Sequence, residues 1–512
     1  MRLQVYYKRW KRYRLEIGII GLLLALAWGV RYLAALHAGI EVDEPIYRSA
    51  AAYAAQFGFP AVRAEYQQQT IPFLYHPPFF LLILAQWFRL WHSASFLTGR
   101  LFNVCASTLL LALLYLFVRH KIGRVEAALA LLLIGSDAWI IFTNQAIYLE
   151  NSQLILILLA VWAYWWATEA DASNSRQAAG RFLIAGVLVG CVLIYKQIGG
   201  FLILSILANW LFQRRHHRGH LLLLVTALAI LAEYLLVMHL SFGSLFDDAT
   251  FVQIERTLWG RSSAGLTYGP LTALAAIGSL YWLFITTILT LLGGSALAVT
   301  RAFQHLFRKR QGNTIILSWA LGGIVFALSI SLKSPHYMML WLVPLYLLLI
   351  QEGCQWARRH MVPLQRETWI ALATVILLLI NLWSFQARFL HVPGDTLAEA
   401  DTYINRDVPA NAVVVTEDYI GTDIRASYIN INFVQTPGAV YRSRAQYLAL
   451  YWSTTEPLPK SLGDITSYCY PMATFSGFKD TVEICQINQK VLAERFAPSK
   501  LIERPARTRS KP

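Results

Sequence analysis

The sequence has 512 residues, of which 56% are hydrophobic and only 14% are charged, and its mean hydropathy is +0.46. Several apolar runs are long enough to cross the roughly 30 Å of hydrocarbon in a bilayer, which excludes a soluble multidomain protein and predicts an all-α polytopic membrane protein. The net charge of +15 lies in short loops between these runs, so it records membrane orientation and argues against nucleic acid as a partner.

The first apolar run, at 15–36, follows a basic N-terminus and is too long for the hydrophobic region of a signal peptide. We therefore expect a membrane span whose N-terminal end lies in the cytoplasm. About eleven spans are expected in all. Their ranges are 15–36, 97–118, 126–143, 151–167, 182–197, 198–212, 220–240, 271–297, 314–332, 337–351 and 368–387.

The segment 77–92 is treated differently, because it is short, opens with two prolines and contains Arg89. If it crossed the bilayer, the basic clusters after Arg119 would lie outside, against the positive-inside pattern. We therefore expect a juxtamembrane helix within a first extracytoplasmic loop at 37–96. Four charged candidates and a C-terminal domain then share the extracytoplasmic face: Asp43, Glu150, Lys196, Lys333 and residues 388–490.

The first loop holds two polar motifs. Asp43 and Glu44 come soon after the first span, where a carboxylate can act as a general base on a substrate held at the membrane surface. The alternative is that this acidic pair caps the helix that begins near Pro45. His76 lies near the far end of the loop, before two prolines, and is either a polar tip at the interface or a substrate ligand.

Charged residues also mark the ends of later spans, at Arg100, Glu150, Lys196 and Lys333. A charge at such a position is unfavourable unless it is paired or has a function. Three cations at outer ends run against the positive-inside pattern, so we expect them to bind an anionic headgroup, most simply a phosphate. Glu150 would balance these cations or hold a divalent metal together with Asp43.

Other charged residues are interpreted as structural. Asp137, Glu233 and His239 lie inside apolar segments, and we expect internal hydrogen bonds for them. Arg256 and Arg261 lie in an outer loop and are expected to be ordinary surface charges.

The composition changes near residue 388, where a small soluble α/β domain is expected at 388–490. Its predicted elements are a helix at 395–407 and strands near 411–416, 428–434 and 482–487. Cys469 and Cys485 could pair there if the domain is extracytoplasmic. The basic tail at 491–512 is expected to be disordered.

The order of these motifs resembles the GT-C membrane glycosyltransferases, above all the dolichyl-phosphate-mannose–protein mannosyltransferases and the lipid A aminoarabinose transferases. The resemblance covers roughly residues 10–355 and implies a GT-C transmembrane domain at 1–387. Besides the acidic pair and the His-Pro-Pro turn, it rests on four short motifs. These are Gly99-Arg100-Leu101, Tyr148-Leu149-Glu150-Asn151, Tyr195-Lys196-Gln197-Ile198-Gly199-Gly200 and Lys333-Ser334-Pro335-His336-Tyr337.

The resemblance implies an inverting transfer of a sugar from a polyprenyl phosphate to a hydroxyl of a lipid, glycan or protein. Asp43 would be the general base with Glu44 as its partner, and Glu150 stands where the family usually has Asp. The substrates would lie among His76, Arg100, Lys196, Lys333, His336 and Tyr337. No cofactor is required. A divalent metal is an option, although His76 stands where the aminoarabinose transferases have a Glu linked to metal.

Two other classes of function are weighed against this one. A transporter or lipid flippase would place its charged residues near the bilayer midplane, whereas the candidates here lie at the ends of spans, and no internal repeat is evident. A scaffold subunit without activity is the second alternative. We expect a glycosyltransferase of the cytoplasmic membrane whose active site and C-terminal domain lie outside, in contact with membrane lipids.

Overall fold

The computed structural model describes residues 2–41, 43–63, 70–170, 175–213, 216–255, 284–308, 314–329, 335–387, 395–421, 424–431, 434, 436–453, 465–476 and 480–496. The chain divides into two compact units. The first comprises Met1–Ala38, Ala50–Pro60 and Pro72–His391, and the second comprises Gly39–Ser49, Ala61–Ile71 and Val392–Pro512. Two short segments of the first loop therefore belong to the same unit as the C-terminal part of the chain.

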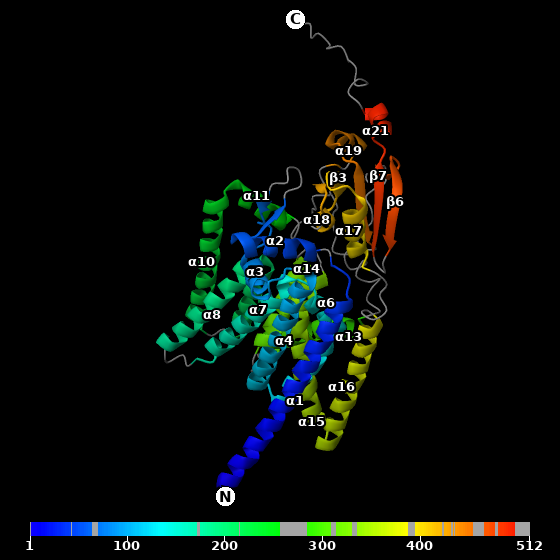
Figure 1. Cartoon of the computed structure of the whole chain (residues 1–512). Helices are drawn as coiled ribbons and strands as arrows, with labels where there is room; N and C mark the ends of the chain where they lie inside the picture. The colour runs from blue at the N-terminus through cyan, green and yellow to red at the C-terminus, as the bar shows by residue number, and fades with distance from the viewer. Residues whose placement is uncertain are drawn as a thin grey trace. The chain divides into compact units, whose positions relative to one another are not determined.

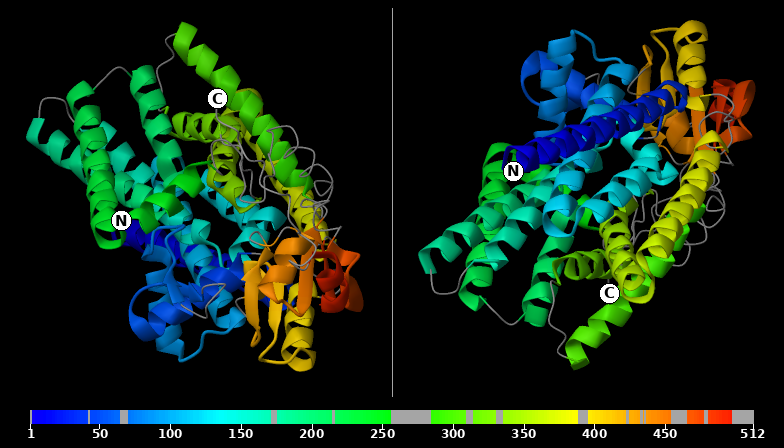
Figure 2. Two further views of the ribbon diagram at one scale, coloured as in Figure 1. Left: turned by 90° about the horizontal axis from the view of Figure 1, so that it is seen from above. Right: turned by 90° about the horizontal axis from the view of Figure 1, so that it is seen from below.

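The first unit is a bundle of helices (Figures 1 and 2). Helix α8 packs against both α7 and α10, and α4 packs against α1, α5 and α7. The helices and their bounds are α1 (Arg2–His37), α3 (Phe79–Trp91), α4 (Phe96–Lys121), α5 (Arg124–Ser136), α6 (Ala138–Gln145), α7 (Leu149–Thr168), α8 (Ser175–Tyr195), η1 (Gln197–Gly200), α9 (Phe201–Gln213), α10 (His217–Phe242), α11 (Ser244–Ile254), α13 (Ile285–Arg308), α14 (Ile315–Ser329), η4 (Pro335–Met338), α15 (Met339–His360) and α16 (Pro363–Phe385).

The helices differ in how much of their apolar surface is covered. In the most apolar window of the α15 span 72% of the residues are buried, against 17% in the α10 span. On α10, large side chains such as Leu221, Val225 and Leu240 are exposed. An apolar helix with so much uncovered surface is typical of a helix that contacts lipid. Helix α15 therefore lies in the interior of the bundle, and α10 lies at its periphery.

Among the described residues, seven helices are long and apolar enough to cross a membrane, and an eighth is added if α5 and α6 count as one broken span. Helices α3, α9 and α14 are apolar but shorter. Thirteen residues of α3 extend about 20 Å, less than the hydrocarbon thickness, which agrees with the juxtamembrane helix expected at 77–92. The first part of the predicted span 271–297 lies outside the described residues, and α13 begins at Ile285. The count of eleven stays a prediction.

One predicted span is not a continuous helix. The segment 126–143 is divided into α5 and α6, which meet at an angle of 64°. Asp137 lies at the break in an extended conformation, and its Oδ1 accepts a hydrogen bond from the backbone N–H of Ile140 at 2.9 Å. The apolar pattern was misleading here because an Asp in a helical run competes for the backbone and starts a new helix.

The second unit is built around a five-stranded sheet with strand order β4-β3-β5-β7-β6. Strand β3 pairs in parallel with β4 and β5, whereas β7 pairs antiparallel with β5 and β6. The strands are β3 (Val413–Thr416), β4 (Ser427–Asn430), β5 (Tyr447–Ser453), β6 (Cys469–Ser476) and β7 (Asp480–Ile487). A separate two-stranded sheet joins β1 (Ala61–Arg63) to β2 (Thr70–Pro72).

Helices cover both faces of the five-stranded sheet (Figure 1). Val414 packs with residues of α17 (Thr396–Asp407), whereas its neighbour Val415 packs on the other face with residues of α19 (Pro437–Ser443) and α21 (Gln489–Phe496). This division follows from the alternation of side chains along a strand. The small C-terminal α/β domain expected from the sequence is confirmed, and a disulfide joins Cys469 to Cys485 across β6 and β7.

Candidate active site

An ion pair lies buried inside the first unit, between Lys196 and Glu150. The Nζ atom of Lys196 is 2.5 Å from Oε1 of Glu150, and the two residues are 3% and 0% exposed. Glu150 lies in the first turn of α7, and Lys196 lies in an extended link between α8 and η1. Because two charges without water are unfavourable unless they are paired, each residue requires the other at this place.

Three rings surround this pair. The Nε2 atom of His336 lies 3.7 Å from the same Oε1 atom of Glu150, and the Lys196 ammonium lies 4.8 Å from the ring centroid of Tyr337. His336 also stacks on Tyr148, with 4.3 Å between ring centroids. The turn η4 thus brings its histidine and tyrosine to the start of α7. A cation over an aromatic face is stabilised by the ring quadrupole.

The position of Lys196 is fixed through its backbone. Its carbonyl accepts a hydrogen bond from Nε2 of Gln153 at 2.8 Å, and the hydroxyl of the preceding Tyr195 is 2.6 Å from that of Ser152. A Cβ atom at Gly199 would meet Val192 and Gln153, so only glycine lets η1 approach this closely. These contacts hold the link between α8 and η1 against the first turn of α7.

The segment before Glu150 is held in a similar way. The carbonyl of Ala146 accepts a hydrogen bond from Nδ2 of the buried Asn103 at 2.5 Å. A Cβ atom at Gly99 would clash with Ile147, so a glycine on α4 allows this segment to pack directly on the helix. Helix α4 therefore determines where α7 begins.

One oxygen of the Glu150 carboxylate differs from the other. Oε1 receives Lys196 and His336, whereas Oε2 is buried and has no hydrogen-bond partner among the described residues. Buried polar atoms in folded proteins nearly always have a partner, so an atom of this kind marks a place where a ligand group can bind.

Arg100 is also buried in the first unit, but it has a different set of partners. Its Nη1 donates to the carbonyls of Ala35 and Ala38, at 2.9 and 2.8 Å. These carbonyls lie at the C-terminal end of α1, where cations stabilise the helix. At least part of the guanidinium therefore serves the end of α1 rather than a substrate.

The acidic pair of the first loop lies in the second unit, and Glu150 lies in the first. Asp43 is half-buried, and its carbonyl accepts from the N–H of Tyr47 at 3.1 Å at the start of α2 (Glu44–Phe57). Glu44 is fully buried, and its Oε2 accepts from the N–H of Glu41 at 2.9 Å. The Asp43 backbone thus takes part in the first turn of α2, and the Glu44 side chain bonds to the backbone just before that helix.

Two further candidates remain. His76 is half-buried in the first unit, with its ring centroid 6.1 Å from that of Phe73. Lys333 lies outside the described residues, as do Arg256 and Arg261. Of the predicted site residues, the structure thus brings Glu150, Lys196, His336 and Tyr337 together. Tyr148, Gln153 and Tyr195 were missed as site residues, although two of them lie within the motifs that carried the resemblance.

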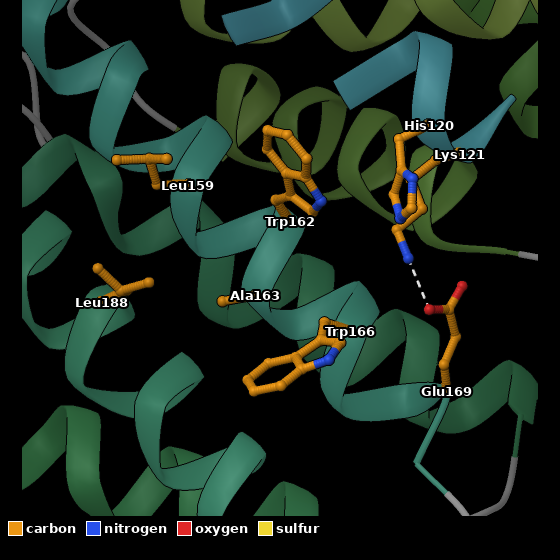
Figure 3. A pocket seen from close by; sticks show the side chains of 8 residues that line it. All are labelled: His120, Lys121, Leu159, Trp162, Ala163, Trp166, Glu169 and Leu188. Atoms are coloured by element: carbon orange, nitrogen blue, oxygen red, sulfur yellow. Dashed lines mark hydrogen bonds and ion pairs between the residues drawn. The ribbon is translucent and has the colours of Figure 1, made fainter. Parts of the chain in front are cut away.

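A groove of about 360 Å³ lies near the other end of α7 (Figure 3). Trp162 and Trp166 line it together with Lys121, which pairs with Glu169 at 2.6 Å. Trp166 is sixteen positions after Glu150, a distance of about 24 Å along α7. This groove is therefore not part of the candidate site.

The family comparison gives one match within the chain. The sequence model of the dolichyl-phosphate-mannose-protein mannosyltransferase family matches residues 62–246, which is less than half of the chain. A comparison with curated protein sequences gave no match. The matched range contains Arg100, Glu150 and Lys196.

Similar solved structures extend the likeness to most of the chain. ArnT from Cupriavidus metallidurans, bound to undecaprenyl phosphate, gives a TM-score of 0.59 at 14% identity, over 91% of this chain and 98% of that one. The chain has the GT-C fold. The Archaeoglobus fulgidus oligosaccharyltransferase, tethered with an acceptor peptide, gives 0.55 at 11% identity, over 84% of this chain and 69% of that one. The polytopic membrane fold of the GT-C type, expected from the motifs, is confirmed.

Another structure of the Archaeoglobus enzyme is a complex with Zn and sulfate. In the part of the GT-C chain that the structure describes, no three His, Cys, Asp or Glu side chains come together as a metal site.

Proposed function

We propose that this protein is a membrane glycosyltransferase that moves a sugar from a polyprenyl phosphate to a hydroxyl acceptor. The observation that carries the proposal is the buried Lys196–Glu150 pair in a GT-C fold, with one carboxylate oxygen that has no hydrogen-bond partner among the described residues. A relative of the same fold, the archaeal AglB, is known in complex with a dolichol-phosphate, at a TM-score of 0.52 and 12% identity. That ligand agrees with the donor proposed here.

In this proposal Lys196 binds the phosphate of the donor. As the bond between the anomeric carbon and the phosphate oxygen breaks, the electron pair stays on that oxygen and negative charge increases on the lipid phosphate. A fixed cation in a site without water stabilises such a charge more strongly than water does. Glu150 keeps Lys196 in place through Oε1, and Oε2 accepts a hydrogen bond from a hydroxyl of the sugar or of the acceptor.

Asp43 is proposed as the general base. Its carboxylate takes the proton from the acceptor hydroxyl, and the acceptor oxygen attacks the anomeric carbon from the side opposite to the phosphate. One carbon–oxygen bond forms and one breaks, so the configuration at that carbon inverts. The lipid, glycan or protein nature of the acceptor and the extracytoplasmic location of this step are part of the same proposal.

The test is a transfer assay with purified full-length protein and a panel of radiolabelled polyprenyl-phosphate sugars. We expect the label to move to an acceptor, and Asp43→Asn to lower the rate by roughly 10²–10⁴-fold, the usual contribution of a general base. Asp407→Asn is the matched control, because Asp407 is an exposed carboxylate in the same unit. Transfer by Asp43→Asn at the wild-type rate would refute the base assignment, and no transfer by the wild type from any donor would refute the function.

A further inference from the structure

A buried arginine lies in the last two turns of α1, six residues before the helix ends at His37. Arg31 is 0% exposed, and its Nη1 donates to the carbonyls of Ala27 and Gly135, at 3.1 and 2.9 Å. Its Nε donates to Oδ1 of Asn144 at 3.0 Å. A guanidinium in an apolar span is expensive to bury, so residues of this kind usually have a function.

The hydrogen-bond chain continues from Asn144 to the candidate site. Nδ2 of Asn144 donates to Oδ1 of Asn151 at 2.5 Å, and Nδ2 of Asn151 donates to the carbonyl of Thr143 at 3.0 Å. Both asparagines are almost completely buried. Asn151 is the residue directly after Glu150. A continuous chain of side chains therefore leads from α1, through α6, to the first turn of α7.

Asn144 also contacts the other side of the site. Its Nδ2 lies 3.2 Å from Sδ of Met339, and Oγ1 of Thr143 lies 3.3 Å from the same sulfur. Met339 begins α15 directly after the turn η4, which carries His336 and Tyr337. The end of α6 thus adjoins the first turn of α7, which carries Glu150, and the start of α15, which follows His336 and Tyr337.

The break between α5 and α6 explains why such a chain is needed. A continuous helix would fix the end of α6 through its own backbone, but α6 has only eight residues and begins at a bend of 64°. Short helices depend on tertiary contacts for their position. The contacts of Arg31 span the break, since they reach Gly135 before it and Asn144 after it.

We propose that Arg31 and Asn144 are positioning residues that fix the first turn of α7, and with it the Glu150 carboxylate, for the transfer reaction. The proposal rests on the function proposed above. In this proposal they act through Asn151 and the first turn of α7, and not on a substrate. Their role is to keep Glu150 at the distance from Lys196 and His336 that the reaction requires, because a misplacement of about 1 Å can lower a rate by roughly 10²-fold.

The experiment compares Asn144→Leu with Asn209→Leu in the full-length protein. Asn209 is an equally buried amide that bonds to Tyr164 near the other end of α7 and to Thr314, at 2.8 and 2.6 Å. Both variants lose a buried amide, but only one of them adjoins Glu150. We expect kcat to fall about 10–100-fold in Asn144→Leu, with little change in KM for the donor, and to stay near wild type in Asn209→Leu.

Hydrogen exchange of the backbone provides a readout that does not depend on activity. We expect faster exchange of residues 146–153 in Asn144→Leu than in Asn209→Leu. Equal losses of kcat in the two variants, or unchanged exchange and unchanged kcat in Asn144→Leu, would overturn the positioning role. If the wild type transfers no sugar from any donor, the proposed function fails, and the exchange result alone decides whether the network holds the turn.

A second variant covers the case in which Asn144→Leu does not fold. The double variant Arg31→Met, Asp137→Asn removes the buried cation together with the buried carboxylate that interacts with it electrostatically, so no buried charge is left uncompensated, and it takes away the Arg31 donor that holds Asn144. We expect it to fold, to show fast exchange at 146–153 and to have the same low kcat. A folded double variant with wild-type kcat and wild-type exchange would contradict the proposal.

Discussion

Two ion pairs with similar nitrogen–oxygen distances lie in very different surroundings. Lys196 and Glu150 are 2.5 Å apart and almost fully buried in the first unit. Arg406 and Asp407 are 2.7 Å apart in the second unit, with side chains that are 70% and 34% exposed. Distance alone would rate the two pairs as equivalent. Burial decides otherwise, because water screens the exposed pair and solvates each partner when the other is removed.

The difference also concerns function. The exposed pair needs no support from neighbouring side chains, because water solvates both partners. The backbone around the buried pair is held by Gln153, Asn103 and the Arg31–Asn144–Asn151 chain. Such support is what a site needs if its charges are to be in place before the substrate arrives.

The largest effect is expected for Lys196→Met. This change leaves the Glu150 carboxylate buried without its cation, which should lower the free energy of unfolding by about 3–5 kcal/mol. Chemical denaturation of the purified protein in detergent measures this. Adding Glu150→Gln to the same chain removes the uncompensated charge, so most of the lost free energy of unfolding should be recovered. If the single and double variants are equally unstable, the pair is not coupled as the structure implies.

A somewhat smaller effect is expected for Asp137→Ala at the break between α5 and α6. The carboxylate accepts from Ile140 N–H and from the hydroxyls of Tyr346 and Thr287, at 2.9, 2.6 and 2.9 Å. Removing it leaves these buried donors unpaired and should lower the free energy of unfolding by about 2–4 kcal/mol. Asp137→Asn retains an acceptor, so its free energy of unfolding should fall clearly less than that of Asp137→Ala. Equal stability of Asp137→Ala and wild type would mean that the break has another cause.

In the second unit, Asp395→Ala should have a moderate effect. The Asp395 side chain caps α17 through the N–H of Ala398 at 3.1 Å, and it also accepts from the N–H of Ile40 at 2.8 Å. Loss of a helix cap lowers stability by about 0.5–2 kcal/mol. Hydrogen exchange of residues 396–407 should become faster, while Asp395→Asn, which can still cap the helix, should resemble wild type. Unchanged exchange in Asp395→Ala would rule out the capping role.

The smallest effect is expected for Asp407→Asn. The Arg406 guanidinium holds the pKa of the Asp407 carboxyl below its usual value, so the pair stabilises the fold above the unfolded pKa and loses this effect as the pH falls through the folded pKa. Because both groups are exposed, thermal melts at pH 7 and at pH 3 should differ little between variant and wild type. A large loss of stability at pH 7 alone would contradict the comparison.

Several features could be predicted from the sequence because they depend on local patterns. Charges at the ends of apolar runs pointed to Glu150 and Lys196, and the Lys-Ser-Pro-His-Tyr motif supplied His336 and Tyr337. Asp137 was expected to find internal hydrogen bonds, and it does. The change in composition after residue 388 predicted a domain with strands, which the sheet of the second unit confirms.

Other features depend on contacts between distant residues, and no local pattern records them. The bond between Ile40 and Asp395 joins residues 355 positions apart, so the grouping of the first loop with the C-terminal sheet could not be predicted. Arg31 lies within the apolar run that predicted the first span, so nothing in that pattern distinguished it. Asn144 and Asn151 carry no charge, so nothing in their residue type distinguished them from other polar residues in an apolar segment.

The most direct measurement of the central claim is sugar transfer by the double variant Lys196→Met, Glu150→Gln. We expect this protein to fold with nearly wild-type stability and to transfer labelled sugar from a polyprenyl phosphate roughly 10²–10³-fold more slowly than wild type, or not at all. Transfer at the wild-type rate by the folded double variant would show that the buried pair only supports the fold and that the chemistry occurs elsewhere.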